Sequence, residues 1–358
     1  MKLEVKSMSS YHDQQDIANT LKLRELIASL PEFCKEYFRG IEQTTSSRTR
    51  IAYAYDLKIF FDYLIEDVSF FKDYTMERFE ISDLEQLRPD HIEIYMDYLS
   101  YYSSQDSNHM ERTNKERAKS RKLASLRSFY TYFYKKEKIT YNPSLLVSLP
   151  KLHQKHIVRL ESNEVADLLD AIESGEGLTD KEKVYHKKTV TRDLTIITLL
   201  LGTGIRVSEC VGLNCKDIDF AVNGIKITRK GGNEVIIYFG DEVEDALHRY
   251  LEERHKIITA DPDDADALFL SLQNKRIQVR SIQNLVKKYA KLITRIKNIS
   301  PHKLRSTFGT ALYKETGDIY LVADVLGHKD VNTTRKHYAE IEDERRRRAA
   351  KSVTLREK

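Results

Sequence analysis

The sequence is poor in cysteine and has no long apolar run, and both shortages exclude classes of protein. Its three cysteines, Cys34, Cys210 and Cys215, are too few and too scattered for a disulfide framework, and the last two lack companions at metal-ligand spacing. They are typical of thiols in a reducing compartment. No N-terminal segment resembles a signal peptide, and no run is long enough to cross a membrane. We therefore expect a soluble, cytoplasmic protein with no membrane partner.

Motifs for nucleotides and metals are missing as well. The chain has no G-x-x-x-x-G-K-[ST] phosphate loop. Gly202-Thr203-Gly204 lacks the third glycine and the preceding strand of a dinucleotide fingerprint. No pair of carboxylates at metal-ligand spacing stands out beside the polar motifs described below. We therefore expect neither a cofactor nor a metal.

The net charge is small, but the basic residues are clustered. Lys and Arg number 59 against 55 Asp and Glu, which leaves +4. Clusters of basic residues can follow a phosphate backbone, but each cluster taken alone is more typical of a solvated helix face. The clusters cover residues 112–127, 181–192, 287–303 and 345–348.

A chain of 358 residues is long for one domain and natural for two. Segment 143–159 contains Pro143 and Pro150 and has weak periodicity, so it is expected to link the domains. The expected division is a flexible tail over 1–19, a helical domain over 20–142, the linker, a second domain over 160–340 and a charged tail over 341–358.

Apolar residues at helical spacing predict that the fold is mainly α. One stretch differs: Ile225–Tyr238 reads as two strands joined by a turn at Gly231-Gly232, which places Lys230 at the lip of a hairpin. The polar insert 173–191, with two glycines, predicts a loop. The helical stripes cover residues 21–30, 44–64, 89–101, 111–136, 162–172, 195–201, 241–258 and 279–296.

The predicted helix 111–136 combines an apolar stripe with a basic N-terminal part. A basic helix on an apolar core is a reasonable DNA-facing element, and a soluble amphipathic helix is an equal alternative. The candidate DNA contacts on it are Arg117, Arg121, Lys122 and Arg127.

The most informative stretch is Ser300–Tyr338, and it begins with a helix start. Serine is a good N-cap, and Pro301 suits the first helical position. His302 and Arg305 are three residues apart, so they share one face of this helix. Gly317 is expected to end the helix.

Two further helices are predicted in the same stretch. A short one over 318–326 ends at Gly327, and His328 follows at that turn. Asn332 can cap a third helix that carries Tyr338. Helix faces and helix ends thus supply two histidines, an arginine and a phenol.

These side-chain types suit phosphoryl transfer to tyrosine. Histidine transfers protons near neutral pH, and arginine clamps a phosphate with a rigid fork of donors. Tyrosine, with a pKa of about 10, becomes a useful nucleophile only where the site accepts its proton.

The order H-x-x-R, L-G-H and then a tyrosine ten residues later resembles the C-terminal signature of the tyrosine recombinases, the phage integrase family. Upstream, LGTGIRVSECVGL over 201–213 resembles the family's other arginine motif in its Xer-type form. Ser306 stands where Xer-type members often have histidine, which weakens assignment to a subgroup and touches no catalytic role. The resemblance covers most of the chain.

The resemblance implies roles for the motif residues. Arg206 and Arg305 would clamp the scissile phosphate, and Tyr338 would be the nucleophile. His302 would be its general base or a phosphate ligand. His328 would be a second donor to the phosphate, compatible with capping the turn after Gly327.

Lys230 would be the general acid for the leaving oxygen, with neighbouring Arg229 as a competing candidate. An ordinary turn lysine is the plain alternative. Arg206 opens a helical segment, where anions are welcome. The plain alternative is an arginine that only pairs with Glu209, three residues on; in the catalytic role Glu209 would be its orienting partner.

The implied architecture is a helical core-DNA-binding domain followed by a mixed, mostly α catalytic domain with a small β-hairpin. The implied activity is cleavage and rejoining of duplex DNA at a specific core site through a 3′-phosphotyrosine, by a homotetramer exchanging strands through a Holliday junction. A type IB-like topoisomerase and a catalytically silent DNA-binding protein are the alternatives. The charged tail 341–358 is expected to dock on a neighbouring protomer, with a solvated helix as the plain alternative. The need for an accessory protein is left open.

Overall fold

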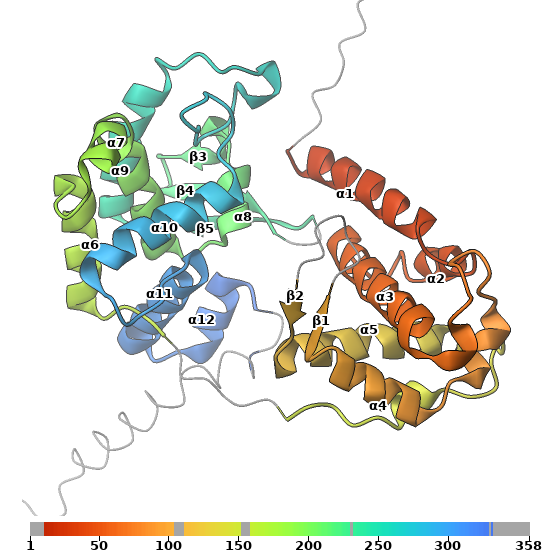
Figure 1. Ribbon diagram of the computed structural model, residues 1–358. Coiled ribbons are helices and arrows are strands. Elements are labelled where there is room, and N and C mark those ends of the chain that lie inside the picture. Colours follow the sequence, from red (N-terminus) through yellow and green to blue (C-terminus); the bar gives the residue numbers. More distant parts are fainter. Residues whose placement is uncertain (1–10, 104–110, 152–157, 230–231, 329–330, 332–358) are drawn as a thin grey trace, which may run out of the picture. The chain divides into compact units, whose positions relative to one another are not determined.

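The computed structural model of the chain describes residues 11–103, 111–151, 158–229, 232–328 and 331. The chain divides into two compact units, Met1–Lys155 and His156–Lys358 (Figure 1). This division falls inside the segment 143–159 that the sequence analysis assigns to a linker. No helix of the described residues is long and apolar enough to cross a membrane.

The first unit is built from helices and one small hairpin. Strands β1 and β2 pair antiparallel, with Tyr102 opposite Arg112. The elements are α1 (Tyr11–Ala28), α2 (Cys34–Gly40), α3 (Ser47–Asp67), α4 (Pro89–Tyr98), β1 (Tyr101–Ser103), β2 (Glu111–Thr113) and α5 (Glu116–Lys135), with 3₁₀ turns at Ser69–Phe71, Ile81–Gln86 and Pro143–Leu145.

Aromatic side chains fill the core of the first unit. Phe129 of α5 is fully buried and meets Tyr37 edge-on with ring centres 5.2 Å apart, and Phe133 at 5.1 Å. Such pairs add roughly 0.5–1.5 kcal/mol each beyond the area they bury. The apolar stripe predicted for this helix therefore packs as expected.

The second unit is mostly helical and contains a three-stranded antiparallel sheet in the order β3-β4-β5. Its register pairs Ile225 with Ile237 and Thr228 with Glu234, so the predicted hairpin is present. The elements are α6 (Ser162–Ser174), α7 (Asp180–Thr203), α8 (Val207–Gly212), β3 (Ile218–Asp219), β4 (Gly224–Thr228), β5 (Glu234–Tyr238), α9 (Asp241–Arg254), α10 (Val279–Ile293), α11 (Pro301–Thr316) and α12 (Ile319–Leu326).

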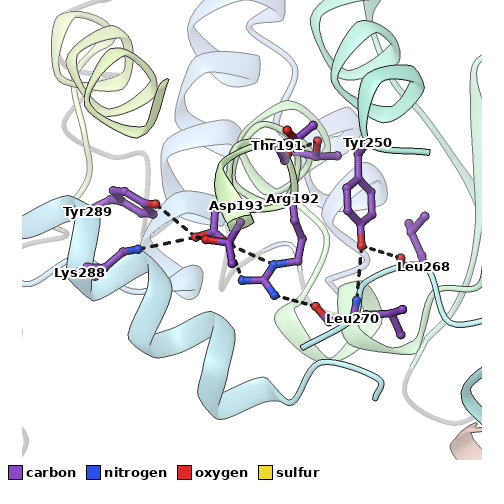
Figure 2. Close-up of polar contacts among 10 residues, drawn as sticks. Thr191, Arg192, Asp193, Tyr250, Leu268, Leu270, Lys288 and Tyr289 are labelled. Atoms are coloured by element: carbon purple, nitrogen blue, oxygen red, sulfur yellow. Dashed lines mark hydrogen bonds and ion pairs between the residues drawn. The ribbon is translucent and has the colours of Figure 1, made fainter. Parts of the chain in front are cut away.

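A buried carboxylate fixes α7 to its neighbours. Asp193 is 2% exposed and accepts hydrogen bonds from Thr189 of its own helix and from Tyr289 of α10, with Lys288 at 3.6 Å (Figure 2). Arg192 binds the same carboxylate at 2.7 Å and donates to the Leu270 carbonyl. Burial lowers the pKa of Lys288, and Asp193 opposes that effect. This network holds the helix that leads into Arg206.

Several sequence expectations about element bounds are wrong. Residues 11–19 belong to α1, so the expected flexible tail over 1–19 is too long. The helix expected over 111–136 begins at Glu116, because residues 111–113 pair as a strand. The loop expected over 173–191 is mostly α7, whose start is capped by Thr179 and Glu182 bonding reciprocally.

The expected linker also begins too early. Pro143 and Ser144 are buried, and Val147 belongs to the core of the first unit. Arg127 holds this segment by donating from Nε to the Ser144 carbonyl at 3.0 Å and from Nη2 to the Val147 carbonyl. The first unit therefore extends beyond residue 142.

Candidate active site

Helix α11 presents His302 and Arg305 as predicted. Ser300 occupies the N-cap position and Pro301 the first turn, and Gly317 ends the helix with φ 72°. His302 is exposed, whereas Arg305 is 6% exposed. A buried guanidinium needs acceptors, and Arg305 donates from Nη1 to the Gly204 carbonyl at 2.6 Å and from Nη2 to the Leu326 carbonyl.

Arg206 is the N-cap residue of α8. Its Nη1 donates to Oε1 of Glu209 at 2.8 Å, and its backbone N–H donates to Oε2 at 2.7 Å. Glu209 thus serves both alternatives raised by the sequence: it pairs with Arg206 and it orients the guanidinium. The anion that occupies this helix start is Glu209 itself.

Helix α12 ends in the turn that the L-G-H sequence predicts. Gly327 has φ 61°, its N–H donates to the Asp324 carbonyl, and the His328 N–H donates to the Ala323 carbonyl at 2.8 Å. This pair of bonds is a Schellman motif. The turn fixes the backbone of His328 directly after the helix end.

Three arginines from separate elements converge on this helix end. Arg229, just after β4, donates to the Asp324 carbonyl at 3.3 Å and to the Val325 carbonyl at 2.8 Å. Arg305 of α11 takes the Leu326 carbonyl, and Arg206 takes the Gly327 carbonyl at 3.2 Å. The last carbonyls of a helix lack partners inside the helix and carry its negative dipole end, so cations are favoured there.

Two glycines permit this convergence. Gly204 has φ 63°, and a Cβ on it would lie 2.3 Å from Phe308. Gly327 has φ 61°, and a Cβ on it would lie 2.1 Å from Nη1 of Arg229. Any L-residue at either position would strain the backbone and collide with the side chain that packs there.

Some of the predicted site lies outside the described residues. Lys230, Tyr338 and the tail 341–358 are in this group. The structure does bring Arg206, Arg305 and His328 to one helix end, with His302 on the same helix as Arg305. The sequence analysis did not predict the contact of Arg229 with that helix end, because it considered Arg229 only as a competing candidate for the general acid in place of Lys230.

The sequence offers two other tyrosines near the signature, Tyr313 and Tyr320, and both are expected to be packing residues and not nucleophiles. Tyr313 is 4% exposed and contacts the Val322 and Leu326 cluster, as expected. Tyr320 is 71% exposed, so that expectation is wrong. It lies in the first turn of α12, whose buried residues are Val322, Ala323 and Leu326.

The basic residues predicted to contact DNA have different environments. Arg117 is exposed. Arg121 and Lys122 both bind the buried carboxylate of Asp56, at 2.7 Å and 3.1 Å. Burial lowers the pKa of Lys122, and Asp56 opposes that effect. The donors of Arg127 described above are used inside the first unit.

A cavity of about 650 Å³ opens beside two of these residues. Arg121 and Lys122 line it, together with Arg112 of β2 and the paired Lys58 and Asp62 of α3. Its lining carries more cations than carboxylates. Among the described residues of both units, no group of three or more His, Cys, Asp or Glu side chains is arranged to hold a metal.

The chain is similar to known proteins over most of its length. The phage integrase family matches residues 158–345. Tyrosine recombinase XerC of Caldanaerobacter subterraneus subsp. tengcongensis is 35% identical over 340 residues, which are 91% of this chain and 86% of that protein. Tyrosine recombinase XerC of Leptospira interrogans serovar copenhageni is 29% identical over 309 residues, covering 86% and 88%.

Solved structures share the fold. XerH site-specific recombinase bound to difH substrate aligns with a TM-score of 0.60 at 20% identity, over 84% of this chain and 80% of that one. A lambda integrase dimer bound to a COC′ core site aligns with a TM-score of 0.58 at 15% identity, over 84% and 95%. At these identities the likeness is one of fold.

The second unit, mostly helical with a small antiparallel sheet, shares its fold with DNA recombinases of solved structure. The chain belongs to the phage integrase family, as a Xer-like tyrosine recombinase. Its activity is site-specific recombination of the tyrosine type, and the topoisomerase and binding-only alternatives are not favoured.

Proposed function

We propose that this recombinase cleaves double-stranded DNA at a specific core site through a covalent 3′-phosphotyrosine at Tyr338. The observation that carries the proposal is the shared placement of Arg206 and Arg305. Each donates to a carbonyl at the end of α12, directly before His328. Three candidate phosphate ligands from three parts of the sequence therefore meet at one place.

The attack begins at the phenol. The Oη atom of Tyr338 forms a bond to phosphorus, and His302 accepts its proton. His302 suits this role because it is exposed on the same helix as the buried Arg305. General base catalysis of this kind contributes roughly 10²–10⁴-fold in rate.

Negative charge grows on the non-bridging oxygens as the bond forms. The guanidiniums of Arg206 and Arg305 and the imidazole of His328 donate to these oxygens. Donors that are fixed before the reaction cost no reorganisation in the transition state. The carbonyl contacts at α12 fix the two guanidiniums, and Glu209 fixes Arg206 a second time.

The bond to the 5′-bridging oxygen then breaks, and Lys230 protonates that oxygen. The products are a 3′-phosphotyrosine and a free 5′-hydroxyl. The phosphodiester energy stays in the new covalent bond, so rejoining requires no nucleotide. The 5′-hydroxyl of a partner strand attacks the phosphotyrosine in the reverse reaction.

The first unit would bind the core site, with exposed Arg117 of α5 as the phosphate contact. Of the other predicted contacts, Arg121 and Lys122 are paired with Asp56, and Arg127 donates to carbonyls inside the first unit. XerH and lambda integrase have been solved on their DNA sites, which supports DNA as the partner here. We further propose that four protomers exchange strands pairwise through a Holliday junction. Recombination by the purified protein alone, without host extract, decides whether an accessory protein is needed.

The test is a cleavage assay on a nicked duplex carrying candidate recombination sites from the host, without metal or nucleotide. The wild type is expected to form a protein–DNA adduct that survives denaturant. Tyr338→Phe should bind the same DNA and form none. Tyr320→Phe, which alters an exposed tyrosine on α12, is the matched control and should form the adduct normally.

An adduct that persists in Tyr338→Phe would refute this nucleophile. Wild-type binding that is tight and weakens steeply with salt, but gives no adduct on any site tested, would refute cleavage by the protein alone.

A further inference from the structure

Arg229 closes the hairpin turn that contains Lys230. Its backbone N–H donates to the Asn233 carbonyl at 2.8 Å, and its own carbonyl accepts from the Gly232 N–H at 3.0 Å. These two bonds join the described residues on either side of 230–231, so the backbone of Arg229, which precedes Lys230 in the sequence, is held by the hairpin.

The side chain of Arg229 ties the same turn to α12. Its guanidinium bridges the Asp324 and Val325 carbonyls. It also lies against Gly327, where an added Cβ would come within 2.4 Å of Cζ. A fork that donates to two successive carbonyls and rests on a glycine has little freedom to move.

The next two carbonyls along α12 receive Arg305 and Arg206. The end of β4, which precedes Lys230 in the sequence, is therefore bound to the same helix end as Arg206 and Arg305, the proposed phosphate clamp. A lysine side chain is flexible, so it can speed proton transfer by proximity only if its backbone is fixed relative to the phosphate.

We propose that Arg229 is a positioning residue for the general acid: it locks the β4–β5 turn against the end of α12 so that Lys230 reaches the leaving oxygen. This inference rests on the proposed role of Lys230. Arg229 acts through Lys230 and does not itself donate to the scissile phosphate.

A substrate with sulfur in place of the 5′-bridging oxygen isolates this role. In that substrate the Tyr338 Oη–P bond forms, the P–S bond breaks, and sulfur leaves with the electron pair as a thiolate. A thiol has a pKa of about 8.5, far below that of an alcohol, so a thiolate is a stable leaving group and departs without being protonated. Loss of the general acid is therefore bypassed, whereas loss of a phosphate clamp is not.

The experiment measures single-turnover cleavage of oxygen and sulfur substrates by the full chain. Lys230→Ala should lose about 10²–10⁴-fold on oxygen and recover on sulfur. Arg229→Ala should lose about 10–10²-fold on oxygen, the scale of a small misplacement, and also recover on sulfur. Arg206→Ala should stay slow on both substrates.

The double variant sharpens the test. If Arg229 acts through Lys230, then Arg229→Ala/Lys230→Ala should cleave oxygen substrate no more slowly than Lys230→Ala alone. Arg229→Lys, which keeps the charge but loses the fork, should fall between wild type and Arg229→Ala. It also serves if the alanine variant folds poorly.

Three outcomes would overturn the inference. Equal slowing of Arg229→Ala on both substrates would make Arg229 a clamp or a fold residue. Wild-type rates on oxygen would remove any role. Recovery on sulfur by Arg229→Ala but not by Lys230→Ala would make Arg229 the acid itself. If neither Lys230→Ala nor Arg229→Ala recovers, the proposed role of Lys230 fails too, which separates the two failures.

Discussion

The cations of α5 in the first unit and those at the end of α12 in the second are held by different kinds of acceptor. On α5, Arg121 and Lys122 bind the carboxylate of Asp56, which is 3% exposed. At α12, Arg229 and Arg305 donate to backbone carbonyls, and Arg206 binds both the Gly327 carbonyl and the carboxylate of Glu209. The carboxylate of Asp56 offsets one of the two positive charges on α5, whereas the carbonyls at α12 orient the guanidiniums and remove no charge.

This difference indicates which cations stabilise the fold and which act in the reaction. A carboxylate offsets the charge of the cation that it binds, so such a pair attracts a distant phosphate less strongly; Arg206, bound to Glu209, can still donate hydrogen bonds to a phosphate that it touches. A carbonyl fixes the guanidinium and leaves its full charge for the transition state. We therefore expect substitutions at the α12 end to lower the rate of cleavage, and substitutions in the Asp56 cluster to lower stability.

The largest effect is expected from Arg305→Lys. A lysine keeps the charge but cannot bridge the Gly204 and Leu326 carbonyls as a fork. Cleavage should fall by about 10³-fold with DNA binding unchanged, measured by adduct formation and gel shift. Arg249→Lys, at an exposed arginine that also donates to a carbonyl, should cleave normally. Similar rates in both variants would contradict the distinction.

Next comes Asp56→Asn, which removes the charge that compensates buried Lys122. Breaking one partner of a buried ion pair should cost about 3 kcal/mol, read from urea unfolding. Asp62→Asn is the control, because its pair with Lys58 is more exposed and should cost under about 1 kcal/mol.

The same variant makes a pH test. With the charge of Asp56 gone, burial and the nearby positive charges of Arg121 and Arg112 lower the pKa of Lys122 further below its usual 10.5. The unfolded state then binds more protons than the folded state, so stability rises with pH. The deficit of Asp56→Asn should therefore shrink as pH approaches 10.5. A deficit that grows with pH would exclude Lys122 as its cause.

A smaller loss is expected from Gly204→Ala. The left-handed backbone there costs an L-residue roughly 1–2 kcal/mol, and the collision with Phe308 adds to it. Cleavage should fall too, because the Gly204 carbonyl holds Arg305. Gly177→Ala has a similar φ of 80° but a nearest contact of 3.3 Å, so it should lose stability and keep its cleavage rate.

Local sequence rules predicted the parts of the site that depend on neighbours in the chain. The Pro301 start, the Gly317 and Gly327 ends and the pairing of Arg206 with Glu209 all lie within a few residues of the signal that predicts them. They required no knowledge of the tertiary fold.

The rest depends on contacts between distant segments. Nothing near Arg229 in the sequence indicates that its guanidinium binds carbonyls 95 and 96 residues away. The first half of α7 is polar and follows Gly175 and Gly177, so the sequence pattern predicted a loop there. The capping box of Thr179 and Glu182 was the signal for a helix start. Strands β1 and β2 have three residues each, too few for an alternation to be recognised.

The smallest effect concerns a cation of the second unit that is held by a carboxylate. Glu164 accepts from Nζ of Lys297 at 2.5 Å and from the Glu161 N–H at 2.8 Å. Partial burial opposes ionisation, but these hydrogen bonds hold the pKa of Glu164 below its usual 4.5. A lowered pKa in the folded state stabilises the protein above pH 4.5, and that stability is lost as pH falls through the folded value. The wild type should therefore be more stable than Glu164→Gln by under about 1 kcal/mol at pH 6, and the difference should shrink as pH falls below 4.5 and the carboxylate takes up its proton. Backbone carbonyls do not titrate in this range, so the contacts of Arg229 and Arg305 have no such acid dependence. A difference that stays constant as pH falls would show that Glu164 acts through packing and not through its charge.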